Sequence, residues 1–167
     1  EIVSVCLEIE TTRDIARQIL RHRSFSFQEF SQRYADPTTD LAFEVRDARL
    51  QDLKNRQNSI EIDRLDEYQG GLQDRWYQVQ QRVIDEATTA YRWAIDNGIA
   101  KEQARAVLPE GNTISRMYVN GTLRSWIHFI ELRSGNGTQL EHMDIAKEVA
   151  SVISTIFPMA NDFVENN

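Results

Sequence analysis

Four arginines lie close together between residues 17 and 33: Arg17, Arg21, Arg23 and Arg33. A guanidinium group binds phosphate oxygens through two parallel hydrogen bonds and stacks on flat rings, which an ammonium group does poorly. The stretch therefore predicts a site for a phosphorylated ligand that carries a flat ring, such as a nucleotide or a flavin. A solvent-exposed arginine face and an RNA-binding arm are the alternatives that the same residues leave open.

Three more cationic or titratable side chains lie on one predicted helix further along the chain, at residues 122–133. Arg124 and His128 are four residues apart, so they share one helix face, and Arg133 falls at the end of that helix. A C-terminal arginine also complements the helix dipole, and a single histidine is often only a packing residue. The three histidines have no metal-site spacing, so we predict no metal. The sequence also lacks a glycine-rich dinucleotide fingerprint and a P-loop.

Composition narrows the classes of function. The net charge of -7 argues against general nucleic-acid binding, which depends on a broad basic surface. The single cysteine, Cys6, excludes an intramolecular disulfide and favours a reducing cytoplasm. No apolar run approaches the roughly 18 residues that a membrane-spanning helix needs, and no signal peptide is recognisable. We expect a cytoplasmic protein that binds neither membranes nor nucleic acid.

Hydrophobic periodicity predicts the elements that position these side chains. We expect strands over 2–10 and 112–121, helices over 13–23, 72–98, 101–109 and 122–133, and a loop over 24–37. The pattern over 41–62 is mixed. A capping box, Thr138 to Glu141, is expected to open a last helix that ends near Pro158. The expected fold is a single α+β domain over 1–167, with a β-sheet packed against long helices. The long helix is predicted to pack centrally through Trp76, Val79, Val83, Ile84, Ala87, Tyr91 and Ala94.

Arg21-His22-Arg23 is followed by seven residues and then Ser31, and the motif continues as "SQRY". This Arg-His-Arg-x7-Ser pattern resembles the signature of the flavin-dependent thymidylate synthases, the thymidylate synthase complementing protein family. Three further blocks resemble that family in the same order: "EQARAVLP" at 102–109, "LRSWIHFIELR" at 123–133 and "TQLEH" at 138–142. Family members carry a segment ahead of the first strand, so the resemblance implies an N-terminally truncated chain.

The resemblance implies a family fold and a homotetramer with its sites where subunits meet. It implies reductive methylation of dUMP to dTMP, with FAD as cofactor and with methylenetetrahydrofolate and NADPH as co-substrates. By resemblance, the dUMP-binding residues are Gln18, Ile19, Leu20, Arg21, Glu29, Phe30, Ser31, Gln32, Arg33, Arg105 and Arg133. The FAD-binding residues are Arg21, His22, Arg23, Glu29, Thr122, Arg124 and His128. Thr122 stands where the family often has asparagine, and Asn120 lies two residues before it.

The residues agree with chemistry that uses no covalent enzyme nucleophile. Cys6 lies in the first predicted strand, far in sequence from the arginine motif. By resemblance Arg133 is the catalytic residue, because a fixed positive charge favours the negative charge that develops on uracil. The alternative is a non-catalytic module that binds a nucleotide or nucleic acid through the same arginines.

Overall fold

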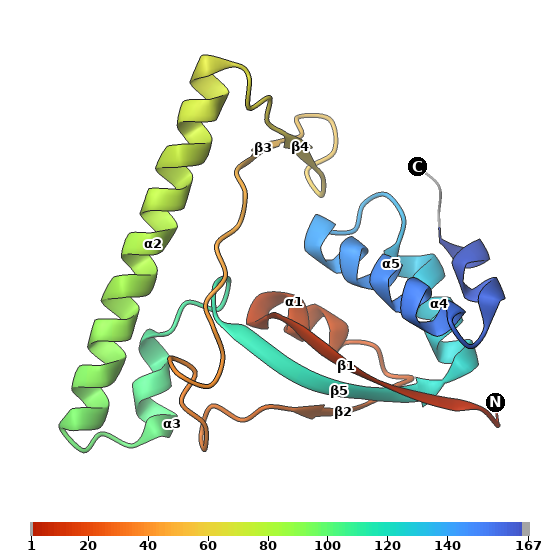
Figure 1. Ribbon diagram of the computed structural model, residues 1–167, viewed down its shortest axis with the longest axis horizontal. Coiled ribbons are helices and arrows are strands. Elements are labelled where there is room, and N and C mark those ends of the chain that lie inside the picture. Colours follow the sequence, from red (N-terminus) through yellow and green to blue (C-terminus); the bar gives the residue numbers. More distant parts are fainter. Residues whose placement is uncertain (1, 165–167) are drawn as a thin grey trace.

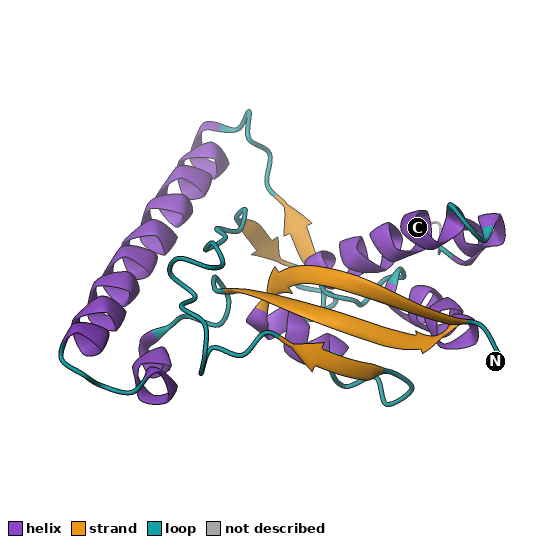
Figure 2. Cartoon of the chain, turned by 60° about the horizontal axis from the view of Figure 1, so that its bottom comes forward, coloured by secondary structure: helices purple, strands orange, loops and turns teal. Residues whose placement is uncertain are grey.

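A three-stranded antiparallel sheet forms the centre of the protein. The computed structural model describes residues 2–164. The strand order is β1 (Ser4–Thr12), β5 (Ile114–Thr122) and β2 (Ser26–Glu29), so the central strand comes last in the chain. Ser4 pairs with Thr122 at one end of β1, and Ser26 of β2 pairs with Asn120. Figure 2 shows the three strands side by side.

Helices cover one face of this sheet. They are α1 (Arg13–Ile19), α4 (Leu123–Arg133), α5 (Leu140–Ser154) and the 3-10 helix η2 (Pro158–Phe163). In α4 the apolar residues Trp126, Phe129 and Ile130 recur three and four positions apart, so they share one face and are fully buried. They pack with residues of β5, α1 and α5 in one core. Each large side chain buried in this way contributes about 1.5–3 kcal/mol.

The longest helix, α2 (Glu67–Asp96), lies to one side of the sheet (Figure 1). Its C-terminal part packs through Tyr91 and Ala94 against the short helix α3 (Lys101–Ala104) and the 3-10 helix η1 (Arg105–Val107). Trp76 and Val83 are 43% and 46% exposed. The predicted packing is therefore confirmed at Ile84, Ala87, Tyr91 and Ala94, which are buried, but not at Trp76 and Val83. The predicted central position is wrong, because an apolar stripe indicates that something covers a helix but not which part of the fold does.

Helix ends and short strands differ most from the sequence predictions. The first helix ends at Ile19 rather than at residue 23. The predicted loop 24–37 contains β2, whose Phe27 packs against the core beside Val119 of the central strand. The alternation of serine and phenylalanine at residues 24–27 was the signal for this strand. The long helix begins at Glu67, five residues before the predicted start.

Two further corrections concern turns and caps. The mixed region contains a small antiparallel pair, β3 (Arg49–Gln51) and β4 (Ser59–Glu61). The last helix does not start from a capping box, because Gln139 is its N-cap residue and makes no cap hydrogen bond through its side chain. The first and second predicted strands, the helix that ends at Arg133 and the α+β fold class are confirmed. Among residues 2–164, no helix is long and apolar enough to cross a membrane.

Candidate functional site

Three helix ends meet near Arg133: the C-terminal ends of α1 and α4 and the N-terminal end of α5. The Nε–H of Arg133 donates to Nε2 of His22, at 3.0 Å. The His22 ring lies edge-on to Phe129 with centroids 5.0 Å apart, and 6.4 Å from the ring of His142. The structure thus places Arg133, the predicted catalytic residue, against His22 of the arginine motif. We call His22, Arg133, His142, Gln18 and Gln139 the helix-end cluster.

Both histidines of this cluster are neutral at physiological pH. Burial, the charge of Arg133 and the neighbouring His128 lower the pKa of His22 to about 4. Burial and the same arginine, followed by His22, lower the pKa of His142 to about 4. Since Nε2 of neutral His22 accepts from Arg133, its proton sits on Nδ1. His22 therefore holds the guanidinium without adding a second positive charge.

Gln18 connects the end of α1 to the start of α5. Its Oε1 lies 3.3 Å from Nδ1 of His142, and its Nε2 donates to Oε1 of Gln139 at 2.8 Å. Gln139 in turn donates from Nε2 to Oε2 of Glu141, at 3.0 Å. Sequence reasoning assigned Gln18 to the site but gave no role to Gln139, Glu141 or His142. Their one signal was the block "TQLEH", which follows the helix of Arg133.

Arg33 and Arg105 form a second group beside α3. Nη2 of Arg33 lies 3.2 Å from a carboxylate oxygen of Glu102, and Nε of Arg105 donates to the carbonyl oxygen of the same residue at 3.3 Å. Ser31 Oγ accepts from the backbone amide of Arg33 at 3.3 Å. Helix α3 and the α4–α5 pair lie at opposite sides of the molecule (Figure 1). The residues predicted to bind dUMP are thus divided between two places in one chain.

The other residues predicted to bind dUMP are partly or fully covered. Glu29 faces inward, where it pairs with Arg13 at 3.1 Å and accepts from Ser115 Oγ at 2.6 Å. Ile19 is fully buried, and Leu20 packs against the core. Gln32 is 4% exposed, and its Nε2 has no hydrogen-bond partner within the described part of the chain. Phe30 donates its backbone amide to the Arg116 carbonyl at 2.8 Å.

Of the residues predicted to bind flavin, Glu29 and His22 face inward as described above, and the others lie on the motif turn and on α4. Arg21 and Arg23 are exposed, and among residues 2–164 neither side chain pairs with a carboxylate. By contrast, Arg17 pairs with Glu110. Arg124 and His128 line a depression of about 440 Å³ together with Ser24, Ser125, Ile127 and Glu131. Thr122 caps α4, because its Oγ1 accepts from the Ser125 amide at 3.2 Å.

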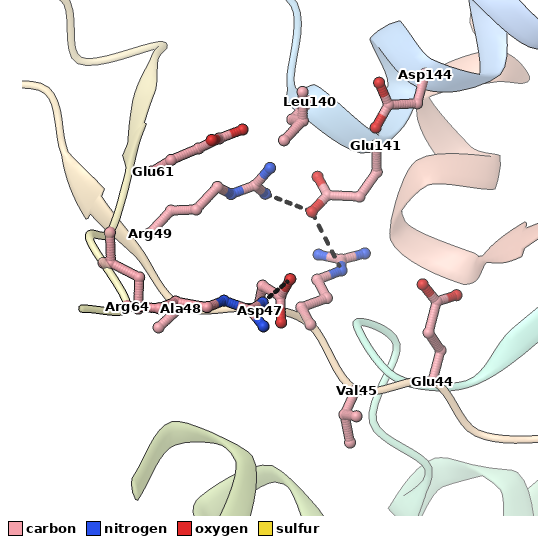
Figure 3. A pocket seen from close by; sticks show the side chains of 12 residues that line it. Glu44, Val45, Asp47, Ala48, Arg49, Glu61, Arg64, Leu140, Glu141 and Asp144 are labelled. Carbon is pink, nitrogen blue, oxygen red and sulfur yellow. Dashed lines mark hydrogen bonds and ion pairs between the residues drawn. The ribbon is translucent and has the colours of Figure 1, made fainter. Parts of the chain in front are cut away.

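A chain segment at residues 44–49 connects the start of α1 to the start of α5. Arg46 donates to both carboxylate oxygens of Asp14, at 2.9 and 2.6 Å, and Arg49 pairs with Glu141 (Figure 3). Burial alone would raise the pKa of Asp14, but hydrogen bonds from Arg46 and Thr12 lower it below the ordinary value. The ion pairs of the 44–49 segment therefore hold the two helix starts at a fixed spacing.

A cluster suited to a metal ion is not found in the described part of the chain. Among residues 2–164, no three histidine, cysteine, aspartate or glutamate side chains gather as a metal site would need.

Residues 1–159 match the model of the family described as thymidylate synthase complementing protein. The flavin-dependent thymidylate synthase of Synechocystis is 46% identical over 158 residues, which cover 95% of this chain and 69% of that protein. The probable flavin-dependent thymidylate synthase of Paramecium bursaria Chlorella virus 1 is 44% identical over the same shares. These similarities do not favour a non-catalytic nucleic-acid-binding module.

Solved structures show the same fold. A UMP/dUMP methylase from Streptomyces cacaoi, bound with 5-Br UMP, superposes with a TM-score of 0.81 at 25% sequence identity. The match covers 96% of this chain and 73% of that one. The structure of that methylase with 5-Br dUMP gives a TM-score of 0.78.

Proposed function

The chain belongs to the thymidylate synthase complementing protein family, and on this basis we propose that it converts dUMP to dTMP as a flavin-dependent thymidylate synthase. Methylenetetrahydrofolate supplies the carbon, and NADPH supplies reducing equivalents through FAD. The observation that carries the proposal is the geometry at Arg133, whose guanidinium is held by a neutral His22 from the arginine motif. A fixed cation held by an uncharged partner keeps its full charge for an anionic ligand.

The side chains near the motif fit an FAD molecule. Arg21 and Arg23 are exposed, and their charges are not neutralised by carboxylates of residues 2–164, so they are available to the pyrophosphate. The depression on α4 adds the guanidinium of Arg124 and the imidazole of His128 as further polar groups. Bound FAD supplies the hydride chemistry. The chain itself binds and orients the cofactor and the substrate, and it excludes water from them.

Arg133 takes the catalytic role in this proposal. Uracil C5 is a poor nucleophile, and a permanent positive charge against the ring stabilises the negative charge that makes C5 reactive. Cys6 has no role in this proposal. It is exposed on the sheet face opposite the helices, since its neighbours Val5 and Leu7 pack against the core.

We further propose a homotetramer in which subunits share each site. Arg33 and Arg105 are separated from Arg133 in one chain, and a second copy would bring such groups together. The exposed aromatic side chains of α2, Trp76, Tyr77 and Trp93, offer apolar area for such contacts. A cytoplasmic location is part of the same proposal and agrees with a free, exposed Cys6.

The test is dTMP formation by the purified chain with dUMP, methylenetetrahydrofolate, NADPH and FAD. Arg133→Ala is expected to lower turnover by about a hundredfold or more, with an unchanged circular dichroism spectrum. The matched control is Arg56→Ala, which removes an exposed arginine at the β3–β4 loop. Near-full turnover by Arg133→Ala would refute the role of Arg133. A folded wild-type chain that neither binds FAD nor forms dTMP would refute the function.

A further inference from the structure

We propose that Glu141 fixes the direction of a hydrogen-bond chain that runs through Gln139 and Gln18 to His142. This direction holds His142 in the tautomer whose Nε2 carries a lone pair, inside the buried cluster that also holds His22 and Arg133. Glu141 and Gln139 are then positioning residues for Gln18 and Arg133, and this consequence rests on the proposed function. Neither residue carries a role from the sequence motifs, and neither touches Arg133 directly.

The direction follows from which atoms can donate. A carboxylate can only accept, so Gln139 must turn its amide nitrogen toward Glu141, as it does at 3.0 Å. Its oxygen then faces Gln18, which donates from Nε2 at 2.8 Å. Gln18 is left with its oxygen toward His142, 3.3 Å from Nδ1. Since this oxygen accepts, Nδ1 of His142 carries the proton, and Nε2 of the neutral ring carries a lone pair.

The lone pair on Nε2 of His142 lies in the buried interior of the protein. His142 is fully buried, and its Nε2 has no hydrogen-bond partner among residues 2–164. The guanidinium of Arg133 is close enough to depress the pKa of both His142 and His22. His22 Nε2 already accepts from Arg133. In this tautomer Nε2 of His142 adds a second lone pair, and not a second N–H, to the buried cluster that holds the guanidinium.

Glu141 is well placed to fix this direction. Its other oxygen pairs with Arg49, and Nε of Arg46 lies 3.9 Å from that same oxygen, so two cations hold the carboxylate in place. Both arginines belong to the 44–49 segment, and Figure 3 labels Arg49 next to Glu141. A glutamine at position 141 would have the same shape, but its amide group can both donate and accept. Every amide in the chain could then reverse.

The tautomer of His142 is measurable without ligand by long-range ¹H–¹⁵N correlation spectra of the full chain labelled on histidine. The signals of His142 are identified by their loss in His142→Gln. We expect the Nδ1–H tautomer in the wild type at pH 7. In Glu141→Gln and in Gln139→Ala we expect a shift toward Nε2–H. Gln139 makes no cap bond through its side chain, so Gln139→Ala removes only the two amide contacts of the chain.

Asp144→Asn is the matched control. It removes a carboxylate from the same helix and the same pocket, but outside the hydrogen-bond chain, so the tautomer and turnover should not change. An Nε2–H tautomer in the wild type would overturn the proposal, as would an unchanged tautomer in both Glu141→Gln and Gln139→Ala. Glu141→Gln should also lower kcat/KM for dUMP by about tenfold to a hundredfold. The spectra do not depend on turnover, so failure of the proposed function and failure of this inference are distinguishable.

Discussion

Replacement of Gly121 by alanine creates a steric clash between the new methyl group and the ring of Phe25. An ideal Cβ at Gly121 lies 2.3 Å from Cδ1 and 2.6 Å from Cε1 of Phe25, well inside van der Waals contact. The ring cannot simply rotate away, because Phe25 is 8% exposed and its centroid is 4.5 Å from that of Trp126. Overpacking of this kind costs about 1–3 kcal/mol. For a domain of this length, the melting temperature should fall by roughly 3–10 °C.

The same substitution should weaken flavin binding. The amide of Phe25 donates to the carbonyl of His22 at 3.3 Å, closing the turn that carries Arg23. A displaced Phe25 ring tilts this turn, so FAD affinity should fall together with stability. Thermal unfolding by circular dichroism and FAD titration by fluorescence quenching measure the two effects.

A matched control and a compensating variant test the steric cause. Gly111 has no atom within 4 Å of a built Cβ and no positive φ, so Gly111→Ala should change the free energy of unfolding by less than about 0.5 kcal/mol. Adding Phe25→Leu to Gly121→Ala should make room for the methyl group and cost less than the two single changes added together. Wild-type stability of Gly121→Ala would refute the reasoning.

Three further predictions follow from other parts of the structure. If subunits share each site, mixing inactive Arg105→Ala and Arg133→Ala chains and letting them exchange should restore about a quarter of wild-type turnover, whereas sites within one chain would give none. His22 and His142 stay neutral in the folded protein down to about pH 4, whereas the unfolded chain protonates them below about pH 6.5, so the free energy of unfolding should fall between pH 6.5 and pH 4. Urea titrations should show that the fully buried His142 contributes about 1.4 kcal/mol per pH unit to this fall, and His142→Gln should remove that contribution. Gly71→Ala adds a methyl group in open space inside α2 and should raise the free energy of unfolding by up to about 1 kcal/mol, measured by the same titrations.

The elements that position the site follow from local patterns, and these were predictable. The helix that ends at Arg133 has an apolar stripe of Trp126, Phe129 and Ile130 and a preceding residue, Thr122, that caps it. The position of Arg133 at a helix end was therefore visible in the sequence. Its hydrogen bond to His22 was not, because the two residues are more than a hundred positions apart and only the tertiary fold brings them together.

Packing partners and polar networks were the parts that could not be predicted. The stripe on α2 is a correct helical pattern, yet nothing in it indicates that Trp76 stays 43% exposed. Likewise, glutamine and histidine are ordinary residues at the start of a helix, so the block "TQLEH" marked Gln139 and His142 without indicating what they contact. Their roles depend on Gln18, which reaches them from another helix.

The order of the strands has a consequence for how the chain folds as it is synthesised. The strand β5 lies between β1 and β2, yet it follows β2 by about ninety residues. Closing a loop of that length costs roughly 4 kcal/mol of chain entropy before any sheet contact forms. At about 5–20 residues per second on the ribosome, the turn with the arginine motif waits roughly 5–20 s for its sheet partner. During that time α2 can form from local contacts alone, while Phe25 and Phe27 remain exposed to other chains and to chaperones.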